Sequence, residues 1–280
     1  MEDHTGYFEA RADNIINKGL LDETSVAFYR ALFELQGREY GRFASLPSLP
    51  PVGAEDLPLS RHAGIVLTDD LLASVAGGAG PLGAVMAEHH PGLVLEPLLG
   101  PLARDRAAFS ELGAVFLALD HERLAALSLR YKTGIEECVF ILTNLLRPVM
   151  TLLREKSAPL IPPAGSPLLC PFCGHYPDMS VIGGGEEGRR LLHCSLCGHR
   201  WPFKRLSCAV CGTEDPAKLE YLSSEGDSRY RIDVCHECGG YIKTVRLDKF
   251  EEVDSCDLAV ENILTAGLDG AAMREGYRRP

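Results

Sequence analysis

The pentapeptide CPFCG, residues 170–174, decides the fold of this chain, because close variants of it return at 194–198 (CSLCG), 208–212 (CAVCG) and 235–239 (CHECG). Together they hold eight of the ten cysteines of the 280-residue sequence. A tetrahedral metal site takes four soft donors at about 2.3 Å, and a tight CxxC turn points both of its sulfur atoms toward one ion. The glycine that ends each copy can adopt the positive φ that such a turn needs. The repeat therefore predicts four metal-binding knuckles.

The spacing between knuckles indicates which of them share an ion. Twenty residues separate Cys173 from Cys194, and 23 separate Cys211 from Cys235, which is what a β-hairpin uses to lead out and back in a zinc-ribbon or rubredoxin site. We therefore expect knuckles that follow one another in the chain to pair, although a crossed pairing of the first with the third stays open. The expected ligands are Cys170, Cys173, Cys194 and Cys197 in one site, and Cys208, Cys211, Cys235 and Cys238 in the other.

The hairpin scheme occurs twice. DMSVIGGGEEGRRLLHC (178–194) and KLEYLSSEGDSRYRIDVC (218–235) each contain two extended stretches around a polar, glycine-containing turn. A further extended stretch follows each second knuckle, and the first cysteines of the two units are 38 residues apart. This duplication predicts two tandem rubredoxin-like or zinc-ribbon-like modules, at 168–206 and 207–247.

Two other uses of paired cysteines fit this pattern poorly. Four disulfides are disfavoured by a reducing cytoplasm and by a helical region large enough to fold alone. A thiol-redox CxxC normally begins a helix, whose dipole lowers the thiol pKa, whereas these flanks are extended and end in glycine. Four thiolates suit zinc and iron alike, so the spacing leaves the metal open between the two. Either ion would contribute on the order of 10 kcal/mol to the folding of so small a module.

Residues 1–157 have the pattern of a helical bundle. In this region Val26, Tyr29 and Phe33 recur at three- and four-residue steps after a polar start that can cap a helix. From Ile135 onward the apolar positions cover more than one helix face, which predicts the central helix of the bundle. We expect five to seven helices and no strand in this part of the chain.

The expected fold class is therefore α plus a small β part. An N-terminal all-α domain (1–157) is followed by a proline-rich linker (158–167), by the two metal modules, and by a short C-terminal helical tail (248–280). The cysteines outside the knuckles are Cys138, on an apolar helix face, and Cys256, and both are expected to pack in the core.

Charge and hydropathy restrict the possible partners and location. The formal net charge is −11, and residues 170–245 hold nine Lys and Arg against ten Asp and Glu, so the basic surface that nucleic acids need is missing. A nucleic-acid-binding zinc ribbon remains the alternative. The polar, acidic N-terminus does not have the pattern of a secretory signal. The apolar run at 138–153 is too short to span a bilayer. We therefore predict a cytoplasmic protein without a membrane span.

No catalytic motif accompanies the cysteines. The chain shows no catalytic triad, P-loop or dinucleotide fingerprint, and we predict that it is not an enzyme. The pair His89 and His90, and the DHE at 120–122, are expected on helix surfaces. Trp201 and Phe203 are expected to pack near the first site. Four histidines adjoin the knuckles but are surplus donors beside four cysteines per site: His175, His193, His199 and His236.

The cysteine motifs resemble one known family, the formate dehydrogenase accessory protein FdhE. The resemblance rests on LLCPFCGHYP (168–177), RRLLHCSLCGHRW (189–201), RLSCAVCG (205–212) and RIDVCHECGGYIKT (231–244), in this order and spacing. These motifs follow a helical half and precede a tail with the sequence DLAVENILTAGLD (257–269). Cys256, directly before this tail, occupies a position at which the family pattern has an acidic residue.

The resemblance implies a function that composition alone does not. It implies a cytoplasmic, non-catalytic factor that is needed to obtain active formate dehydrogenase and that binds the selenium- or molybdenum-dependent catalytic subunit of that enzyme. It also implies two rubredoxin-type iron ions, and the eight knuckle cysteines match the metal-binding positions of the family one by one.

Overall fold

The computed structural model of the chain describes residues 4–17, 21–46, 49–161, 165, 167–183, 188–223, 228–249 and 251–279. Its contacts divide the chain into two compact units. The first contains 22–161 and 172–175, and the second contains 2–21, 162–171 and 176–280. The two predicted hairpin turns, and part of the predicted linker, lie outside the described residues.

The first unit is helical, as the sequence predicts, but its helices are shorter and more numerous than expected. With α1 (His4–Asn17), the described part of 1–157 has nine α-helices instead of five to seven. Proline and glycine divide the middle of this region into pieces too short to show a helical period. The helices of the unit are α2 (Glu23–Ala44), α3 (Ala63–Val66), α4 (Asp69–Gly77), α5 (Ala79–His89), α6 (Glu96–Arg104), α7 (Arg106–Leu117), α8 (His121–Arg130) and α9 (Ile135–Lys156).

Helix α9 lies at the centre of this unit, as its apolar pattern predicts. It contacts α2, α4, α7 and α8, and its side chains are buried on more than one face, including Cys138 and Leu146 at 0% exposure. A polar contact also joins it to α2, because Gln36 Nε2 donates to Asn144 Oδ1 at 2.7 Å. The bundle is therefore built around α9 and its long neighbour α2.

One stretch, Asp69–His89, is long and apolar enough to cross a membrane by length and composition alone. It consists of α4 and α5, which meet at Gly78 and contact α2, α6 and α7. In its apolar window, 44% of the residues are buried inside the protein. The stretch thus packs as a core element of the helical unit.

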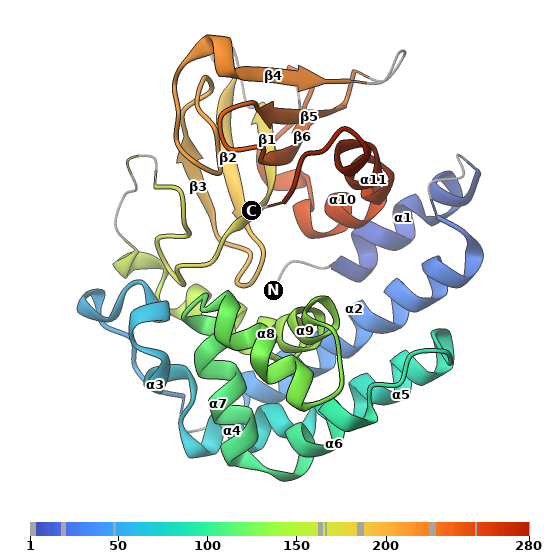
Figure 1. Cartoon of the computed structure of the whole chain (residues 1–280), viewed down its shortest axis with the longest axis vertical. Coiled ribbons are helices and arrows are strands. Elements are labelled where there is room, and N and C mark those ends of the chain that lie inside the picture. The colour runs from blue at the N-terminus through green and yellow to red at the C-terminus, as the bar shows by residue number, and fades with distance from the viewer. Residues whose placement is uncertain are drawn as a thin grey trace. The chain divides into compact units, whose positions relative to one another are not determined.

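The second unit is built on one six-stranded sheet (Figure 1) with the strand order β3-β2-β1-β6-β5-β4. All neighbouring strands are antiparallel except β1 and β6, which run parallel. The two expected modules are therefore not independent ribbons, since this parallel pair joins them into one sheet. The strands are β1 (Pro177–Gly183), β2 (Arg189–Cys194), β3 (Arg200–Phe203), β4 (Leu219–Leu222), β5 (Tyr230–Cys235) and β6 (Tyr241–Arg246).

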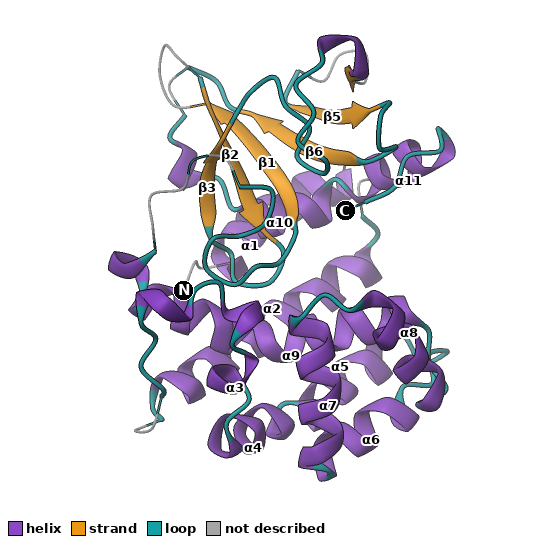
Figure 2. Cartoon of the chain, turned by 60° about the vertical axis from the view of Figure 1, so that its left-hand side comes forward, coloured by secondary structure: helices purple, strands orange, loops and turns teal. Residues whose placement is uncertain are grey.

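The C-terminal helices α10 (Leu258–Leu264) and α11 (Ala266–Arg274) cover one face of this sheet (Figure 2). Leu258 of α10 packs with buried side chains of β1 and β6, and Ala272 of α11 packs with those of β5 and β6. Because strand side chains alternate between faces, the other face carries the remaining positions, among them Arg190, Arg231 and Asp233. The expected helical tail is therefore part of the core of the sheet.

Helix α1 belongs to this second unit, whereas the sequence places it with the helical domain. It packs on α10 through polar groups: Tyr7 Oη donates to Glu261 Oε1 at 2.6 Å, Arg11 lies 2.9 Å from the same oxygen, and His4 Nδ1 lies 2.5 Å from Asp257. Sequence periodicity does not predict this docking, because polar contacts with a segment some 250 residues away leave no local pattern.

A buried lysine gives this unit a pH dependence. Lys243 is 1% exposed and donates to Asp269 Oδ2 and to Asn262 O, both at 2.7 Å. Burial lowers its pKa to about 8, and the nearby Arg279 acts in the same direction. Between this value and the ordinary lysine pKa of about 10.4, the unfolded chain holds a proton that the folded chain has lost. The contribution of Lys243 to stability therefore rises with pH in this window.

We expect the free energy of unfolding to rise more steeply with pH between pH 8 and 10 in the wild type than in Lys243→Met. Urea denaturation at several pH values measures both slopes. Every other titrating group is common to the two proteins, so the difference isolates Lys243. Identical slopes would contradict the lowered pKa.

Candidate metal centres

The first four knuckle cysteines converge on one point. The Sγ atoms of Cys170, Cys173, Cys194 and Cys197 all lie within 4.8 Å of one another, and all four residues are buried. The first pair precedes β1. In the second pair, Cys194 ends β2 and Cys197 lies in the turn that leads to β3. The distance from Cys170 Sγ to Cys197 Sγ is 3.6 Å.

The second group repeats this arrangement but is more open to solvent. It consists of Cys208, Cys211, Cys235 and Cys238, again within 4.8 Å of one another. The Sγ distances are 3.8 Å from Cys208 to Cys238 and 3.8 Å from Cys211 to Cys235. Cys211 is exposed and Cys238 is half-buried. The two groups thus share ligand type and spacing and differ in access.

These distances fit a tetrahedral metal ion. Bonds of about 2.3 Å from one ion to four sulfur atoms give sulfur–sulfur edges of about 3.8 Å. None of the ten cysteines, all of which lie in the described part of the chain, forms a disulfide. The sulfur atoms group in chain order, not crosswise. Each four-cysteine group can therefore hold one metal ion.

The knuckle backbone explains how the turns are formed. Gly174, Gly198, Gly212 and Gly239 have φ between +68° and +82°, the left-handed region that the CxxCG motif predicts. The turns also direct amides at sulfur, since Val210 N–H donates to Cys208 Sγ and Gly240 N–H to Cys238 Sγ, both at 3.3 Å. Such donors stabilise thiolate charge, which is the form that binds a metal.

Burial disfavours the negatively charged thiolate form of these cysteines when no cation is bound. It raises the pKa of the Cys208 thiol, and it raises the pKa of Cys238 to about 12. The pKa of the Cys235 thiol shifts the other way: burial raises it, but hydrogen bonds from the backbone amides of Cys238 and Glu237 lower it overall. A bound cation reverses the balance because it deprotonates the thiols that coordinate it. The second group is therefore suited to cation binding, because a cation stabilises the thiolate form of all four ligands.

The histidines beside the knuckles contact other residues. His193 Nδ1 lies 2.7 Å from Asp178 Oδ1, and His236 Nε2 lies 2.9 Å from Glu220 Oε2. His175 packs against the ring of Phe116 at 4.8 Å, and His199 stacks on Trp201. None of the four belongs to either four-cysteine group in the part of the chain that the structure describes.

Other residues that the sequence singles out have structural positions. Trp201 is fully buried and its Nε1 donates to Pro167 O at 2.9 Å. Asp120 caps α8 by accepting from Arg123 N–H, and His89 and His90 lie edge-on to Phe28. Cys138 and Cys256 are buried, and Cys256 packs with the core cluster beneath β1 and β6, as expected. These placements give none of them a role at the metal centres.

The segment around Arg278 forms hydrogen bonds with the fourth knuckle (235–239), a contact that sequence motifs do not predict. Arg278 N–H donates to Gly239 O at 2.9 Å, and Tyr241 N–H donates to Arg278 O at 3.0 Å. The Arg278 guanidinium also donates to Cys238 O at 3.3 Å. The segment pairs with the knuckle through backbone groups, which every residue has, so composition carries no signal for it.

Replacing Gly239 with alanine is expected to lower the free energy of unfolding by about 1 kcal/mol, because an L side chain is strained at positive φ. The φ of Gly239 is +68° and no atom lies within 4 Å of an added Cβ, so the backbone alone sets the cost. Gly267→Ala in α11, which also meets no atom within 4 Å, is the matched control and should stabilise. Urea denaturation distinguishes them, and a change of the same sign in both would contradict the prediction.

Known proteins share this cysteine region. Residues 169–205 match the family model described as the central domain of FdhE. An FdhE homolog of Edwardsiella ictaluri is 34% identical over 113 residues, which are 40% of this chain and 35% of that protein. An FdhE homolog of Pseudomonas aeruginosa is 34% identical over 119 residues, 40% of this chain and 37% of that protein. The matching sequence therefore spans about a third of the length of these curated relatives.

The fold extends the similarity beyond the aligned sequence. The crystal structure of the FdhE protein from Pseudomonas aeruginosa superposes with a TM-score of 0.62, at 22% sequence identity, over 98% of this chain and 94% of that one. An N-terminal helical domain, two tandem rubredoxin-like or zinc-ribbon-like modules and a short C-terminal helical tail were the expected fold class. This class is confirmed, with the strands of both modules joined in one sheet. The resemblance to the FdhE family that the cysteine motifs indicate is likewise confirmed, in sequence over the metal-binding region and in fold along nearly the whole chain.

Proposed function

We propose that the chain is a non-catalytic assembly factor that acts in the maturation of formate dehydrogenase. The observation that carries this proposal is the combination of two four-cysteine groups with an FdhE fold. The curated relatives with this cysteine region are named as FdhE proteins. The partner would be the catalytic subunit of formate dehydrogenase, bound in the cytoplasm before that subunit joins its complex.

The two metal ions are proposed to shape the second unit. The proposed ligands of the two ions are Cys170, Cys173, Cys194 and Cys197, and Cys208, Cys211, Cys235 and Cys238. Four thiolates around a divalent ion suit zinc and iron, and the family resemblance favours iron of the rubredoxin type. Iron in this ligand set supplies one-electron chemistry, and zinc supplies structure alone.

Affinity capture tests the partner. The tagged full-length chain, expressed in its native cell under anaerobic growth with formate, is expected to recover the catalytic subunit of formate dehydrogenase. A strain that lacks the chain is expected to contain that subunit in an inactive form. Recovery of other proteins without any formate dehydrogenase subunit, together with normal enzyme activity in the deletion strain, would refute the proposal.

Metal analysis of anaerobically purified protein tests the ions separately. We expect two metal ions per chain, by the count of four-cysteine groups. Elemental analysis distinguishes iron from zinc, and iron would colour the protein once it is oxidised to the ferric state. Two zinc ions would leave the protein colourless in either condition and would remove any electron-transfer role. The second result would leave the proposed assembly role in place.

A further inference from the structure

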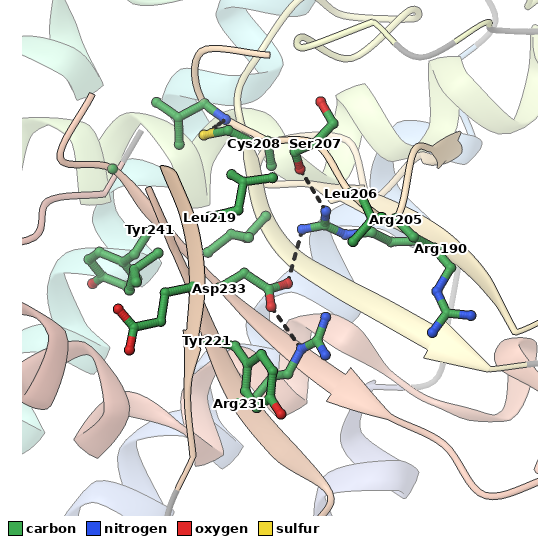
Figure 3. Close-up of a pocket in the computed structure, with 16 residues that line it drawn as sticks. Arg190, Arg205, Leu206, Ser207, Cys208, Leu219, Tyr221, Arg231, Asp233 and Tyr241 are labelled. Atoms are coloured by element: carbon green, nitrogen blue, oxygen red, sulfur yellow. Dashed lines mark hydrogen bonds and ion pairs between the residues drawn. The ribbon is translucent and has the colours of Figure 1, made fainter. Parts of the chain in front are cut away.

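The face of the sheet opposite α10 and α11 carries a network of charged groups. Asp233 on β5 accepts from Arg190 Nη2 at 3.1 Å and from Thr244 Oγ1 at 2.7 Å, and its other oxygen lies 2.7 Å from Arg231 Nε. Figure 3 shows the carboxylate of Asp233 between the two guanidinium groups. Arg190 is 3% exposed and also donates to Ser180 and to Ser207 O. This face therefore carries a buried arginine and its carboxylate partner at the centre of the network.

A cavity of about 190 Å³ opens on this network. Its floor comes from β4, β5 and β6, and its wall is the segment 205–210, which leads into the third knuckle (Figure 3). Two of the most exposed large apolar side chains of the described chain line it, Leu206 at 73% and Tyr221 at 59% exposure. The cavity thus combines positive charge with an apolar rim, as ligand sites do.

Arg231 presents unused donors beside this cavity. Its guanidinium carbon lies 5.1 Å from the centre of the Tyr221 ring, and its Nε lies 2.7 Å from Asp233 Oδ1. Among the described residues, no hydrogen bond engages its two Nη atoms. Paired Nη groups in one plane match the two oxygens of a carboxylate. The side chain is therefore fixed by two neighbours and offers a free bidentate donor pair.

Strand β4, on which Tyr221 lies, is the last strand of the sheet. His236 N–H donates to Lys218 O at 2.9 Å, and bonded residues alternate along an antiparallel pair, so Glu220 and Leu222 bond to β5. The C=O of Leu219 and both backbone groups of Tyr221 consequently point away from β5. Such an edge can accept an added strand.

The charge balance favours one carboxylate over a polyanion. Three arginines and two carboxylates line the cavity, so the lining side chains have a net charge of +1 (3 − 2): Arg190, Arg205, Arg231, Asp233 and Glu220. Cys208 also lines the cavity, and four thiolates around a divalent ion carry a net charge of −2. A nucleic acid, which needs many unneutralised cations, would be repelled here. A single acidic side chain on an extended peptide matches both the donors and the free edge.

We propose that β4 and this pocket bind an extended segment of a partner protein, which pairs with the edge of β4 and places an acidic side chain on the guanidinium of Arg231. The apolar neighbours of that acidic residue would contact Leu206 and Tyr221. The inference rests on the proposed function only in taking the partner to be a protein, and it specifies the chemistry of the segment that is bound.

Peptide binding to the full-length, metal-loaded protein tests this site directly. The probe is a short fluorescent peptide in which valine alternates with glutamate, and fluorescence anisotropy measures its Kd. Arg231→Gln is expected to weaken binding about ten- to hundredfold, the loss of one charged hydrogen-bonded pair. Arg246→Gln, a change at an exposed arginine of β6 that does not line the cavity, is the matched control and should leave Kd unchanged.

Two control peptides separate strand pairing from simple charge attraction. A peptide with lysine in place of glutamate, and one with a central proline that cannot donate to the strand edge, are both expected to lose binding. The proposal is overturned if the wild type does not bind the valine–glutamate peptide, if Arg231→Gln binds it as the wild type does, or if the proline peptide binds equally well. Unchanged metal content and circular dichroism in Arg231→Gln would show that its fold is intact.

Capture of the catalytic subunit provides the second readout. Loss of capture in Arg231→Gln, with retention in Arg246→Gln, supports the site. Retention of capture in both variants overturns the site while the proposed assembly function stands. Failure of the wild type to capture the subunit would count against the proposed function, and the peptide measurement would still decide whether the site exists.

Discussion

Cys194→Ser is expected to reduce the metal content from two ions to one and to unfold the ribbon formed by β1, β2 and β3. The side chain is fully buried and its Sγ is one corner of the first four-cysteine group. Serine cannot supply a soft thiolate, and a structural tetrathiolate ion contributes on the order of 10 kcal/mol in small modules. That is as large as the whole stability of a typical domain. Metal analysis and near-UV circular dichroism measure the loss.

Cys138→Ser is the matched control for this change. Cys138 is also fully buried, but it lies in α9 and belongs to neither four-cysteine group. It is expected to keep both ions and to lose only about 1 kcal/mol, from a buried hydroxyl in an apolar position. If Cys194→Ser retained two ions, or if both variants lost an ion, the assignment of the first group would be wrong.

Glu261→Ala is expected to lower the free energy of unfolding of the second unit by about 3 kcal/mol, because it removes one partner from a buried charge cluster. Glu261 is 0% exposed and accepts from Tyr7 and Tyr230, each at 2.6 Å, while Arg11 and Arg229 lie at 2.9 and 3.5 Å. Burial and the Glu261 charge raise the pKa of both tyrosines, so they stay protonated and donate. Without Glu261, two tyrosines and two arginines lose their shared partner.

Glu251→Ala is the control, since Glu251 pairs with the same Arg229 at 3.0 Å but is 35% exposed. An exposed ion pair contributes less than about 1 kcal/mol. Guanidinium denaturation of both variants, followed by the tyrosine signal, measures the difference. Proteolysis near the N-terminus gives an independent readout, because α1 is held to α10 through Glu261. Equal destabilisation by the two changes would contradict the importance of burial.

The parts of this fold that follow from sequence are those fixed by local chemistry. A CxxCG turn requires a glycine in the left-handed region and two converging sulfur atoms, so the five-residue motif alone predicts the backbone conformation at Gly239. The interval between knuckles favours pairing in chain order, and the structure decides it against the crossed alternative. The apolar periodicity of α9 similarly predicts a central helix, because one helix turn repeats every 3.6 residues.

The parts that sequence does not predict depend on distant partners. The β1–β6 pair, the docking of α1 on α10, and the Arg278 contact with Cys238 all join segments that are at least 40 residues apart. Their contacts are polar or made by backbone atoms, which leave no periodic pattern. Arg231 likewise has the sequence context of any surface arginine, and only the sheet brings it to Asp233 and Tyr221.

The strand order has a consequence for the newly made chain. The last ligand of the first centre is Cys197, whereas β6, the parallel neighbour of β1, ends at Arg246. Translation of the intervening 49 residues (246 − 197) takes roughly 2–10 s at about 5–20 residues per second. During this time the first four-cysteine group of the nascent chain can already bind its ion, although β6, which pairs with the edge of β1, has not yet been synthesised. Because the chain is made from its N-terminus, the first metal centre can bind its ion before the six-stranded sheet is complete.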